Sequence, residues 1–240
     1  MPRRAPKKPD PSLDLSGHLL VLAEDPIFRK GPLDPRSLFP AAAPRAPLEL
    51  EVGSGKGLFL TTAAAAAHDH CFLGVEISHG YAKMTAGRLA RQAAGNARII
   101  AGDGNILVRN LFPDACLDAI HVYFPDPWWK ARHRKRRVLS DMFLAHAGRV
   151  LVRGGVLHVW TDVEEYFEEA MAAAAGTGVF SAPADVPQRQ ATHDLDYRTH
   201  FERRTRLAGQ PVWRAALERT AVEPRVMRVE IPDSPSITDD

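Results

Sequence analysis

The chain has 240 residues, with 31 Lys and Arg against 29 Asp and Glu, so its formal net charge is +2. The hydrophobic fraction of 45% and the charged fraction of 25% exclude a disordered chain, a coiled coil, collagen and a disulfide scaffold. No apolar run approaches the ~18 residues that a membrane span needs, and two cysteines predict a reducing, cytoplasmic location without a disulfide framework.

The two ends of the chain differ in composition from its middle. Residues 1–12 hold four Lys or Arg and four Pro, which predicts a disordered basic arm. Residues 13–47 are rich in proline and contain short apolar stretches, so we expect an irregular lead-in that packs on the main domain. Residues 48–232 form that domain, and the acidic residues 233–240 are predicted to be a disordered tail.

The middle of the chain alternates between apolar strands and helical patterns. Strands are predicted at 48–52, at 71–77, within 97–103, at 117–124 and at 154–162. Helical patterns lie between them, at 57–67, 78–94, 105–112, 137–151 and 163–175. This alternation predicts an α/β fold with a parallel sheet covered on both faces. Such sheets bind ligands at the carboxyl ends of their strands, so each strand end is a place to look for chemistry.

The first strand ends in Glu51-Val-Gly53-Ser-Gly55-Lys-Gly. Glycines allow a tight turn and a close approach of the backbone to a ligand. The third glycine of the dinucleotide fingerprint is replaced by Leu58, which disfavours a nicotinamide enzyme. A carboxylate two residues before the first glycine suits a cationic ligand. Glu76 ends the second strand, where it could accept hydrogen bonds from both ribose hydroxyls. An ordinary strand–helix turn and a solvated glutamate are the alternatives.

The third and fourth strand ends also carry carboxylates. Asp103 stands between two glycines, where it could accept a hydrogen bond from an adenine amino group or belong to a common turn. The fourth strand ends in Phe-Pro-Asp126-Pro-Trp-Trp-Lys, in which two prolines fix the direction of the carboxylate. Six of the eight residues at 130–137 are Lys or Arg. A basic run beside a site loop indicates binding of a phosphate backbone, although a solvated face is the alternative.

The fifth strand ends at Asp162, which is predicted to face Asp126 across one pocket. Asp162 could also be the N-cap of the next helix, because Glu165 stands three residues later. Metal catalysis is not expected. The only close group of histidines, His68-Asp-His70, lacks helical spacing and is interpreted as an exposed loop.

These segments resemble the bacterial tRNA (guanine-N7)-methyltransferases, over about residues 31–220. The matching stretches are LELEVGSGKG, GVEIS, FPDPWWKARHRKRRV, HVWTD and the residues 199–203. FPDPW-x-K followed by a basic run is specific to the family, whereas the Gly-rich turn is shared by all class I methyltransferases. The resemblance implies a Rossmann-like methyltransferase domain at 48–232. It also implies a mostly parallel seven-stranded sheet, helices on both faces and an antiparallel last strand within 212–220.

The resemblance also implies roles for individual residues. It places S-adenosylmethionine, the methyl donor, against Glu51, Gly53, Gly55, Glu76, Asp103 and Asp126. It places the tRNA guanine against Lys130, Asp162, Thr199, His200, Phe201 and Glu202, and it makes Asp126 the catalytic residue. The chain departs from the family at three positions. The family commonly has an aromatic residue at Ser54, His or Pro at Trp129, and Lys at His200.

The implied reaction produces 7-methylguanosine, in the family at a variable-loop guanosine. Guanine N7 has a free lone pair at neutral pH, so we expect Asp126 to orient and stabilise rather than to act as an obligatory base. Trp128 or Tyr197 could stack on the guanine. The expected partner is tRNA, with no membrane, no obligate protein partner and a monomer or homodimer. The alternatives are a methyltransferase for another RNA position or a small molecule, and a non-catalytic RNA-binding relative.

Overall fold

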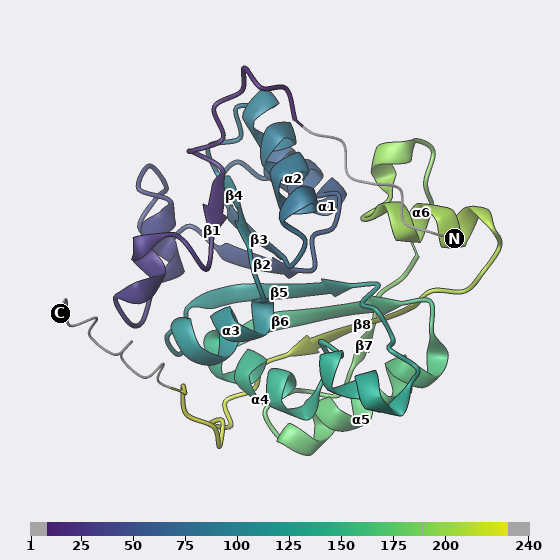
Figure 1. Ribbon diagram of the computed structural model, residues 1–240. Coiled ribbons are helices and arrows are strands. Elements are labelled where there is room, and N and C mark those ends of the chain that lie inside the picture. The colour runs from purple at the N-terminus through teal and green to yellow at the C-terminus, as the bar shows by residue number, and fades with distance from the viewer. Residues whose placement is uncertain (1–8, 189, 230–240) are drawn as a thin grey trace.

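One eight-stranded sheet organises the molecule (Figure 1). The computed structural model describes residues 9–188 and 190–229. The parallel strands are β2 (Leu48–Val52), β3 (Cys71–Glu76), β4 (Ala97–Ala101), β5 (Leu117–Tyr123) and β6 (Leu151–Thr161). Strand β8 (Trp213–Glu218) runs antiparallel to β6, and the short strands β1 (Leu19–Val21) and β7 (Ala184–Asp185) complete the order β1-β4-β3-β2-β5-β6-β8-β7.

The predicted Rossmann-like architecture is confirmed, with one correction to the strand number. Seven strands were expected and eight are present, because β1 joins the sheet as an extra parallel edge strand beside β4. The antiparallel last strand is β8, as expected. Strands β2 and β5 lie next to each other in the middle of the sheet, where the strand order reverses. This switch point is where open α/β sheets form their ligand crevice.

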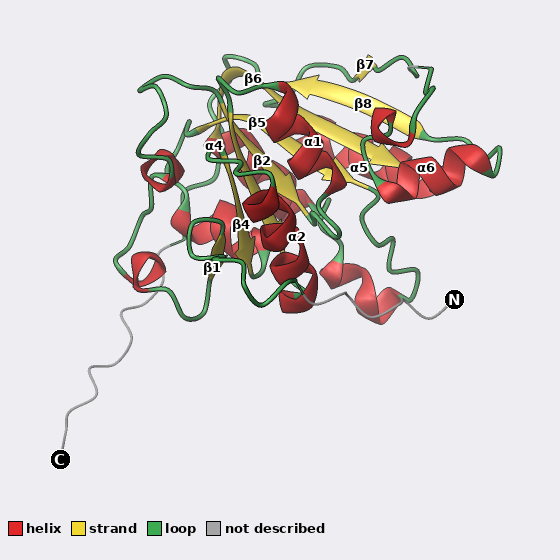
Figure 2. Ribbon diagram, turned by 90° about the horizontal axis from the view of Figure 1, so that it is seen from above, coloured by secondary structure: helices red, strands yellow, loops and turns green. Residues whose placement is uncertain are grey.

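Helices cover both faces of the sheet (Figures 1 and 2). Helices α1 (Leu58–Ala66) and α2 (His79–Arg91) lie on one face, and α6 (His200–Leu207) lies on the same side. Helices α3 (Gly104–Ile106), α4 (Asp141–Val150) and α5 (Glu164–Thr177) lie on the other, with a π-helical turn at Leu107–Leu111. The larger core cluster packs side chains of α4 and α5 on the apolar face of the central strands.

Two predicted boundaries are wrong for identifiable reasons. The helix expected at 137–151 begins only at Asp141, because the Ser140 side chain caps it by accepting from the Phe143 backbone N–H. The strand expected at 154–162 is β6 (Leu151–Thr161). Its register against β5 shifts between Leu151 and Val156, so its first residues do not continue the apolar pattern that marks the rest.

The segment 13–47 contains β1 and two 3-10 turns, at Pro26–Arg29 and Pro35–Leu38. Its side chains of Leu33, Leu38 and Phe39 are buried in the larger core cluster. The arm expected at 1–12 lies partly outside the described residues, and Pro9 packs on Gly87 of α2. The predicted acidic tail lies outside them altogether. Among the described residues, no helix is long and apolar enough to cross a membrane.

Candidate active site

The carboxyl ends of neighbouring strands bring the predicted acidic residues to one edge of the sheet. Strand β2, which ends at Glu51 and Val52, lies between β3 and β5. Asp126 and Asp162 follow β5 and β6, whose last paired residues are Tyr123 and Trp160. The backbone N–H of Phe124 donates to the Trp160 carbonyl over 2.7 Å, which keeps the two chain exits side by side.

The Gly-rich turn after β2 has the tight geometry that its sequence predicts. Gly53, Gly55 and Gly57 have φ values of 81°, 53° and 68°, a region that L side chains rarely adopt. A Cβ at Gly57 would lie 2.3 Å from a methyl carbon of Thr85 in α2, so glycine is required there for packing as well. The turn therefore lies close against α2.

Glu76 reaches across to the Gly-rich turn from the end of β3. Its carboxylate accepts from the backbone N–H groups of Gly55 and Ser78, each over 2.8 Å, and its side chain is buried. These contacts place the carboxylate at the mouth of the turn. Its predicted contact with a ribose is untested and stays a prediction.

Glu51 is the most unusual carboxylate of the site. The residue is only 3% exposed, and among the described residues its Oε2 has no hydrogen-bond partner. Burial, with a smaller contribution from the nearby Glu76, raises the pKa of Glu51 to about 8 although Ser54 opposes the shift. A buried carboxyl group in this state is stabilised by a cation, which supplies the missing partner and favours the charged form.

Asp103 caps the short helix α3. Its Oδ1 accepts from the backbone N–H of Asn105 over 2.9 Å. The following Gly104 packs against Val52 and Val75, each 2.9 Å from where a Cβ would lie, so a larger residue would not fit. The turn interpretation of Asp103 is therefore confirmed, and its contact with an adenine remains a prediction.

The loop after β5 is held in an uncommon conformation. Phe124 and Trp128 have φ values of 52° and 43°, which non-glycine residues seldom adopt outside functional sites. Arg137 is buried and holds this loop in place, because its Nε donates to the Pro127 carbonyl over 2.6 Å. Asp126, between the two prolines, is exposed.

The basic run at 130–137 therefore contains one residue with a structural role. Besides its contact with the loop, Arg137 forms an ion pair with Glu169 and lies over the ring of Tyr166 in α5, at 4.8 Å. Lys130, Arg132 and Arg136 are exposed. The run still presents cations to solvent, but it is anchored on the α5 side of the sheet through its last residue.

The aromatic residues proposed for stacking have other neighbours in this structure. Trp128 lies under the guanidinium of Arg136, at 5.2 Å, and meets the His133 ring edge-on at 5.6 Å. Tyr197 lies under Arg206, at 4.9 Å. Each ring therefore has a guanidinium over one face, and its stacking on guanine is untested and stays a prediction.

Asp162 is exposed at the end of β6, and it does not cap the following helix. The N-cap of α5 is Val163, which makes no side-chain capping bond, so the capping interpretation is wrong. Instead, Thr205 of α6 donates to Asp162 Oδ2 at 3.4 Å. This contact, made by the last turn of α6, brings that helix to the same edge of the sheet.

Helix α6 presents the predicted guanine-side residues in two environments. Thr199 is its N-cap and accepts from the Glu202 backbone N–H over 3.0 Å, while His200 and Phe201 are exposed. The Phe201 ring lies 6.3 Å from the Phe124 ring at an angle of 19°, and Arg204 lies 4.7 Å above it.

Glu202, by contrast, is 3% exposed and fully engaged. Its Oε1 accepts from Arg206 and Arg214 at 3.1 and 3.3 Å, and its Oε2 accepts from the Arg198 backbone N–H at 2.7 Å. These bonds hold α6 on β8. Direct contact between Glu202 and guanine, which is untested, would require some of them to open.

Sequence reasoning misses a polar network beneath α1. Glu49 bridges His70 and His121, at 2.7 Å each, and the other nitrogen of His121 lies 2.8 Å from the Tyr123 hydroxyl. Burial alone would raise the pKa of Glu49, but the two histidines outweigh it and lower this pKa to about 2. His70 is therefore not simply an exposed loop residue. The period of two along β2 and β5, which places Glu49, His121 and Tyr123 on one face, was the available signal.

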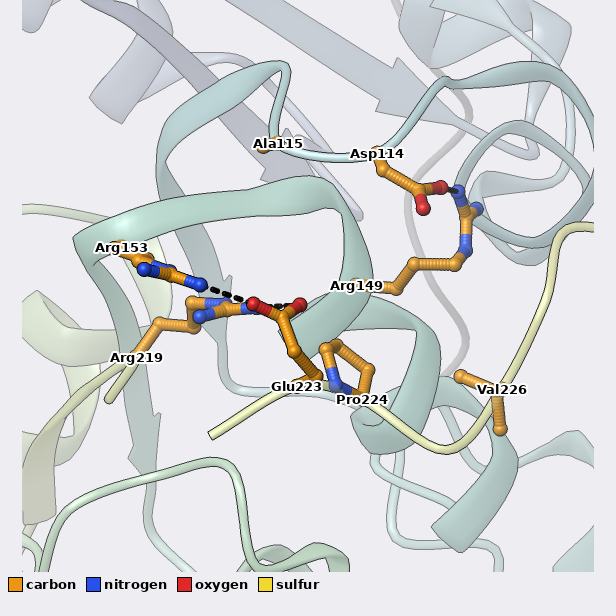
Figure 3. Close-up of a pocket in the computed structure, with 8 residues that line it drawn as sticks. All are labelled: Asp114, Ala115, Arg149, Arg153, Arg219, Glu223, Pro224 and Val226. Carbon is orange, nitrogen blue, oxygen red and sulfur yellow. Dashed lines mark hydrogen bonds and ion pairs between the residues drawn. The ribbon is translucent and has the colours of Figure 1, made fainter. Parts of the chain in front are cut away.

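A cavity of about 190 Å³ lies at the opposite edge of the sheet (Figure 3). It is lined by Asp114, Ala115, Arg149, Arg153, Arg219, Glu223, Pro224 and Val226. Its arginines are paired with acceptors: Arg149 with Asp114, and Arg153 and Arg219 with Glu223. The cavity contains none of the predicted site residues and serves to hold the segment after β8. No group of His, Cys, Asp or Glu among the described residues could hold a metal ion.

Comparison with known proteins agrees with this geometry. A family described as putative methyltransferase matches residues 45–215. The tRNA (guanine-N(7)-)-methyltransferase of Rhodopirellula baltica is 44% identical over 220 residues, which cover 89% of this chain and 79% of that protein. The enzyme of the same name from Anaeromyxobacter dehalogenans is 38% identical over 202 residues, covering 80% of this chain and 94% of that protein.

Solved structures support the fold alone. A point mutant of the 16S rRNA (adenine(1408)-N(1))-methyltransferase from Catenulisporales acidiphilia, with its cosubstrate S-adenosylmethionine, superimposes with a TM-score of 0.51 at 20% identity. The match covers 75% of this chain and 88% of that one. Together with the Gly-rich turn, the buried Glu51 and the Phe-Pro-Asp126-Pro loop, the sequence matches show that the chain belongs to the tRNA (guanine-N7)-methyltransferase family, whose methyl donor is S-adenosylmethionine.

Proposed function

We propose that this protein transfers the methyl group of S-adenosylmethionine to N7 of a variable-loop guanosine in tRNA. The observation that carries the proposal is the pairing of two kinds of carboxylate at one edge of the sheet. Glu51 is buried and lacks a partner for Oε2 among the described residues, which suits a cationic cofactor. Asp126 and Asp162, from adjacent strand ends, are exposed and suit the donor groups of guanine.

The chain's own residues fit S-adenosylmethionine. When bound, the cofactor supplies an electrophilic methyl group on a sulfonium, and it also carries an ammonium. Glu51 supplies the buried negative charge that such a cation needs. Glu76, held at the mouth of the Gly-rich turn, would accept from the ribose hydroxyls, and Asp103 would accept from the adenine amino group.

On the guanine side, the residues orient and stabilise. N7 needs no deprotonation before it attacks, and positive charge appears on the base as the methyl group is transferred. Asp126 and Asp162 would accept from guanine N1–H and N2–H₂ and stabilise this charge, while Lys130 would donate to O6. Alignment of the two reactants is the main task, and in favourable cases it contributes about 7–11 kcal/mol.

Product analysis tests this function. The full-length protein is incubated with S-adenosylmethionine and an unmodified tRNA transcript, and the digested RNA is analysed for 7-methylguanosine by mass spectrometry. Reduction and aniline cleavage of the intact RNA, which cut at 7-methylguanosine, map the position. We expect 7-methylguanosine at a single variable-loop position. A different methylated nucleoside would contradict the guanine assignment, and a site outside the variable loop would contradict the position.

Asp126→Asn tests the assigned role. Removing one preorganised electrostatic contact to a transition state typically costs about 10²–10³-fold in kcat, and we expect a loss of that size. Asp69→Asn, at an exposed aspartate after α1, is the matched control and should retain wild-type turnover. Full turnover in Asp126→Asn would show that this carboxylate neither orients nor stabilises the guanine.

A further inference from the structure

Cationic side chains gather where α2, the Gly-rich turn and α6 meet. Arg88 donates from Nη1 to the Lys56 carbonyl over 2.7 Å, which fixes the last turn of α2 beside the Gly-rich turn. His200, the first residue of α6, interacts electrostatically with both of these residues. Arg91, in the same last turn of α2, is exposed and interacts with Arg88. We call Lys56, Arg88, Arg91 and His200 the α2–α6 basic surface.

Carboxylates do little to neutralise this surface. Helix α2 contains no Asp or Glu. Asp194, which lies near His200, is already paired with Arg203 at 2.6 Å. Asp10 interacts with Arg91 and keeps its negative charge, so it offsets at most one of the cations. Partial desolvation, followed by the neighbouring Arg88 and Lys56, holds the pKa of His200 below its ordinary value, so the positive charge of this surface comes from Lys56, Arg88 and Arg91.

We propose that the α2–α6 basic surface binds the phosphate backbone of tRNA, on the side of the active site opposite residues 130–137. The proposal rests on tRNA being the substrate. The basic run is anchored on α5 through Arg137, whereas α2 and α6 lie on the other side of the sheet (Figure 1). The two cationic surfaces therefore lie on opposite faces of the sheet, and the α2–α6 surface reaches the Gly-rich turn through Arg88 and Lys56.

The path of the RNA strand explains why cationic surfaces are needed on both sides of the active site. A base that is taken out of its stack remains joined to a phosphate on each side, so the RNA chain must leave the site in two directions. Residues 130–137 can hold one of these strands, but they lie on the α5 side only. Lys56 and Arg91 are exposed, and Arg88 uses one of its five N–H donors within the protein, so this surface can hold the other.

Contacts between this surface and RNA phosphates should have a characteristic effect on tRNA binding. Phosphate contacts position a nucleic acid without reading its sequence. Each one also adds about 0.7–0.9 to the magnitude of the slope of log affinity against log salt concentration. The α2–α6 basic surface should therefore contribute to tRNA affinity and to its salt dependence. It should leave the affinity for S-adenosylmethionine unchanged, although Lys56 stands within the Gly-rich turn.

The test uses the full-length protein and an unmodified tRNA transcript, without S-adenosylmethionine. The Kd is measured at several salt concentrations for the wild type and for Lys56→Gln/Arg91→Gln. Both substituted side chains are exposed, so folding should survive. The matched control is Lys30→Gln/Arg45→Gln, which removes the same charges at exposed positions of the lead-in, a segment on the opposite side of Figure 1 from α6. Calorimetry measures S-adenosylmethionine binding to every variant.

We expect the double variant to bind tRNA more weakly and with a slope about 1.5 smaller than the wild type. The control should match the wild type. An unchanged slope, or one reduced equally in the control, would overturn the proposal. So would a weakened affinity for S-adenosylmethionine with tRNA binding intact, because Lys56 would then belong to the cofactor site. A wild-type protein that binds tRNA but forms no 7-methylguanosine would contradict the proposed function and leave this surface standing.

Discussion

Glu51 and Glu202, which the sequence places in one active site, differ in how their buried carboxylates are partnered. Glu51 is buried with an oxygen lacking a partner among the described residues, whereas Glu202 is equally buried but receives two guanidinium groups and a backbone N–H. A buried carboxylate with all its partners is structural, and one without them is prepared for a ligand. Glu51 is therefore the residue at which cofactor binding should be most visible.

Because the pKa of Glu51 is raised, we expect the protein to release a proton when it binds S-adenosylmethionine. A pKa of about 8 leaves about nine-tenths of Glu51 protonated at pH 7, and a cation beside it favours the charged form. We expect close to one proton released per site at pH 7. Calorimetric titration in two buffers with different ionisation enthalpies measures this number directly.

Glu51→Gln is the control for that experiment. Its amide cannot ionise, so the released proton should disappear and the affinity should fall. Asp126→Asn removes a carboxylate that is exposed, and its proton release should stay at the wild-type value. Equal binding enthalpies in the two buffers for the wild type would contradict a protonated Glu51 in the free protein.

At the scale of the element, the loop after β5 depends on an arginine that its sequence assigns to a basic patch. Arg137 is buried between the Pro127 carbonyl, Glu169 and the ring of Tyr166. Among the described side chains of this run, Arg137 is buried, and nothing in the sequence of the run distinguishes it from its neighbours. Its role becomes visible only when α5 is placed beside the loop.

Arg137→Gln should therefore lower activity by loosening the loop after β5, and not by removing a contact with the RNA backbone. Losing a hydrogen-bonded buried charge costs about 2 kcal/mol, and Asp126 would lose its fixed direction. We expect a lower Tm and a lower kcat with an unchanged salt dependence of tRNA binding. Arg132→Gln, an exposed neighbour in the same run, should show the reverse: an unchanged Tm and a shallower salt dependence. Identical behaviour of the two variants would refute this division of the run.

The elements that sequence analysis predicts well are those with a strong local pattern. Strand β2 matches its predicted range, and β3 and β5 end within a residue of theirs. The turn signals are clear where glycine follows β2 and where Phe-Pro follows β5. Strands β1 and β7 are three and two residues long, too short for a pattern, and only pairing with a neighbour defines them. In the site, Glu51 and Asp126 are predictable from local motifs. The ion pairs that hold Glu202 cannot be predicted in this way, because one partner, Arg214, comes from β8 and lies beyond the end of α6.

At the scale of the whole molecule, two groups of buried titratable residues set opposite limits on stability. On the α1 face, burial lowers the pKa of His121 and brings that of His158 to about 3, while Glu49 titrates at about 2. These folded-state values lie below the unfolded ones, so the unfolded chain takes up protons first and stability falls as pH drops below about 6.5. Glu51 acts in the opposite sense. Its folded pKa is raised, so stability falls as pH rises from about 4.5 to about 8.

The unliganded protein should therefore be most stable near pH 6.5, and S-adenosylmethionine should relieve only the alkaline limit. The cofactor favours the ionised form of Glu51, so its stabilising effect should grow between pH 6.5 and 8, whereas the acidic decline set by Glu49, His121 and His158 should remain. Tm measured from pH 5 to 8, with and without saturating S-adenosylmethionine, tests both limits. Glu51→Gln should lose the alkaline decline even without the cofactor. A decline that persists in this variant would assign the alkaline limit to another group.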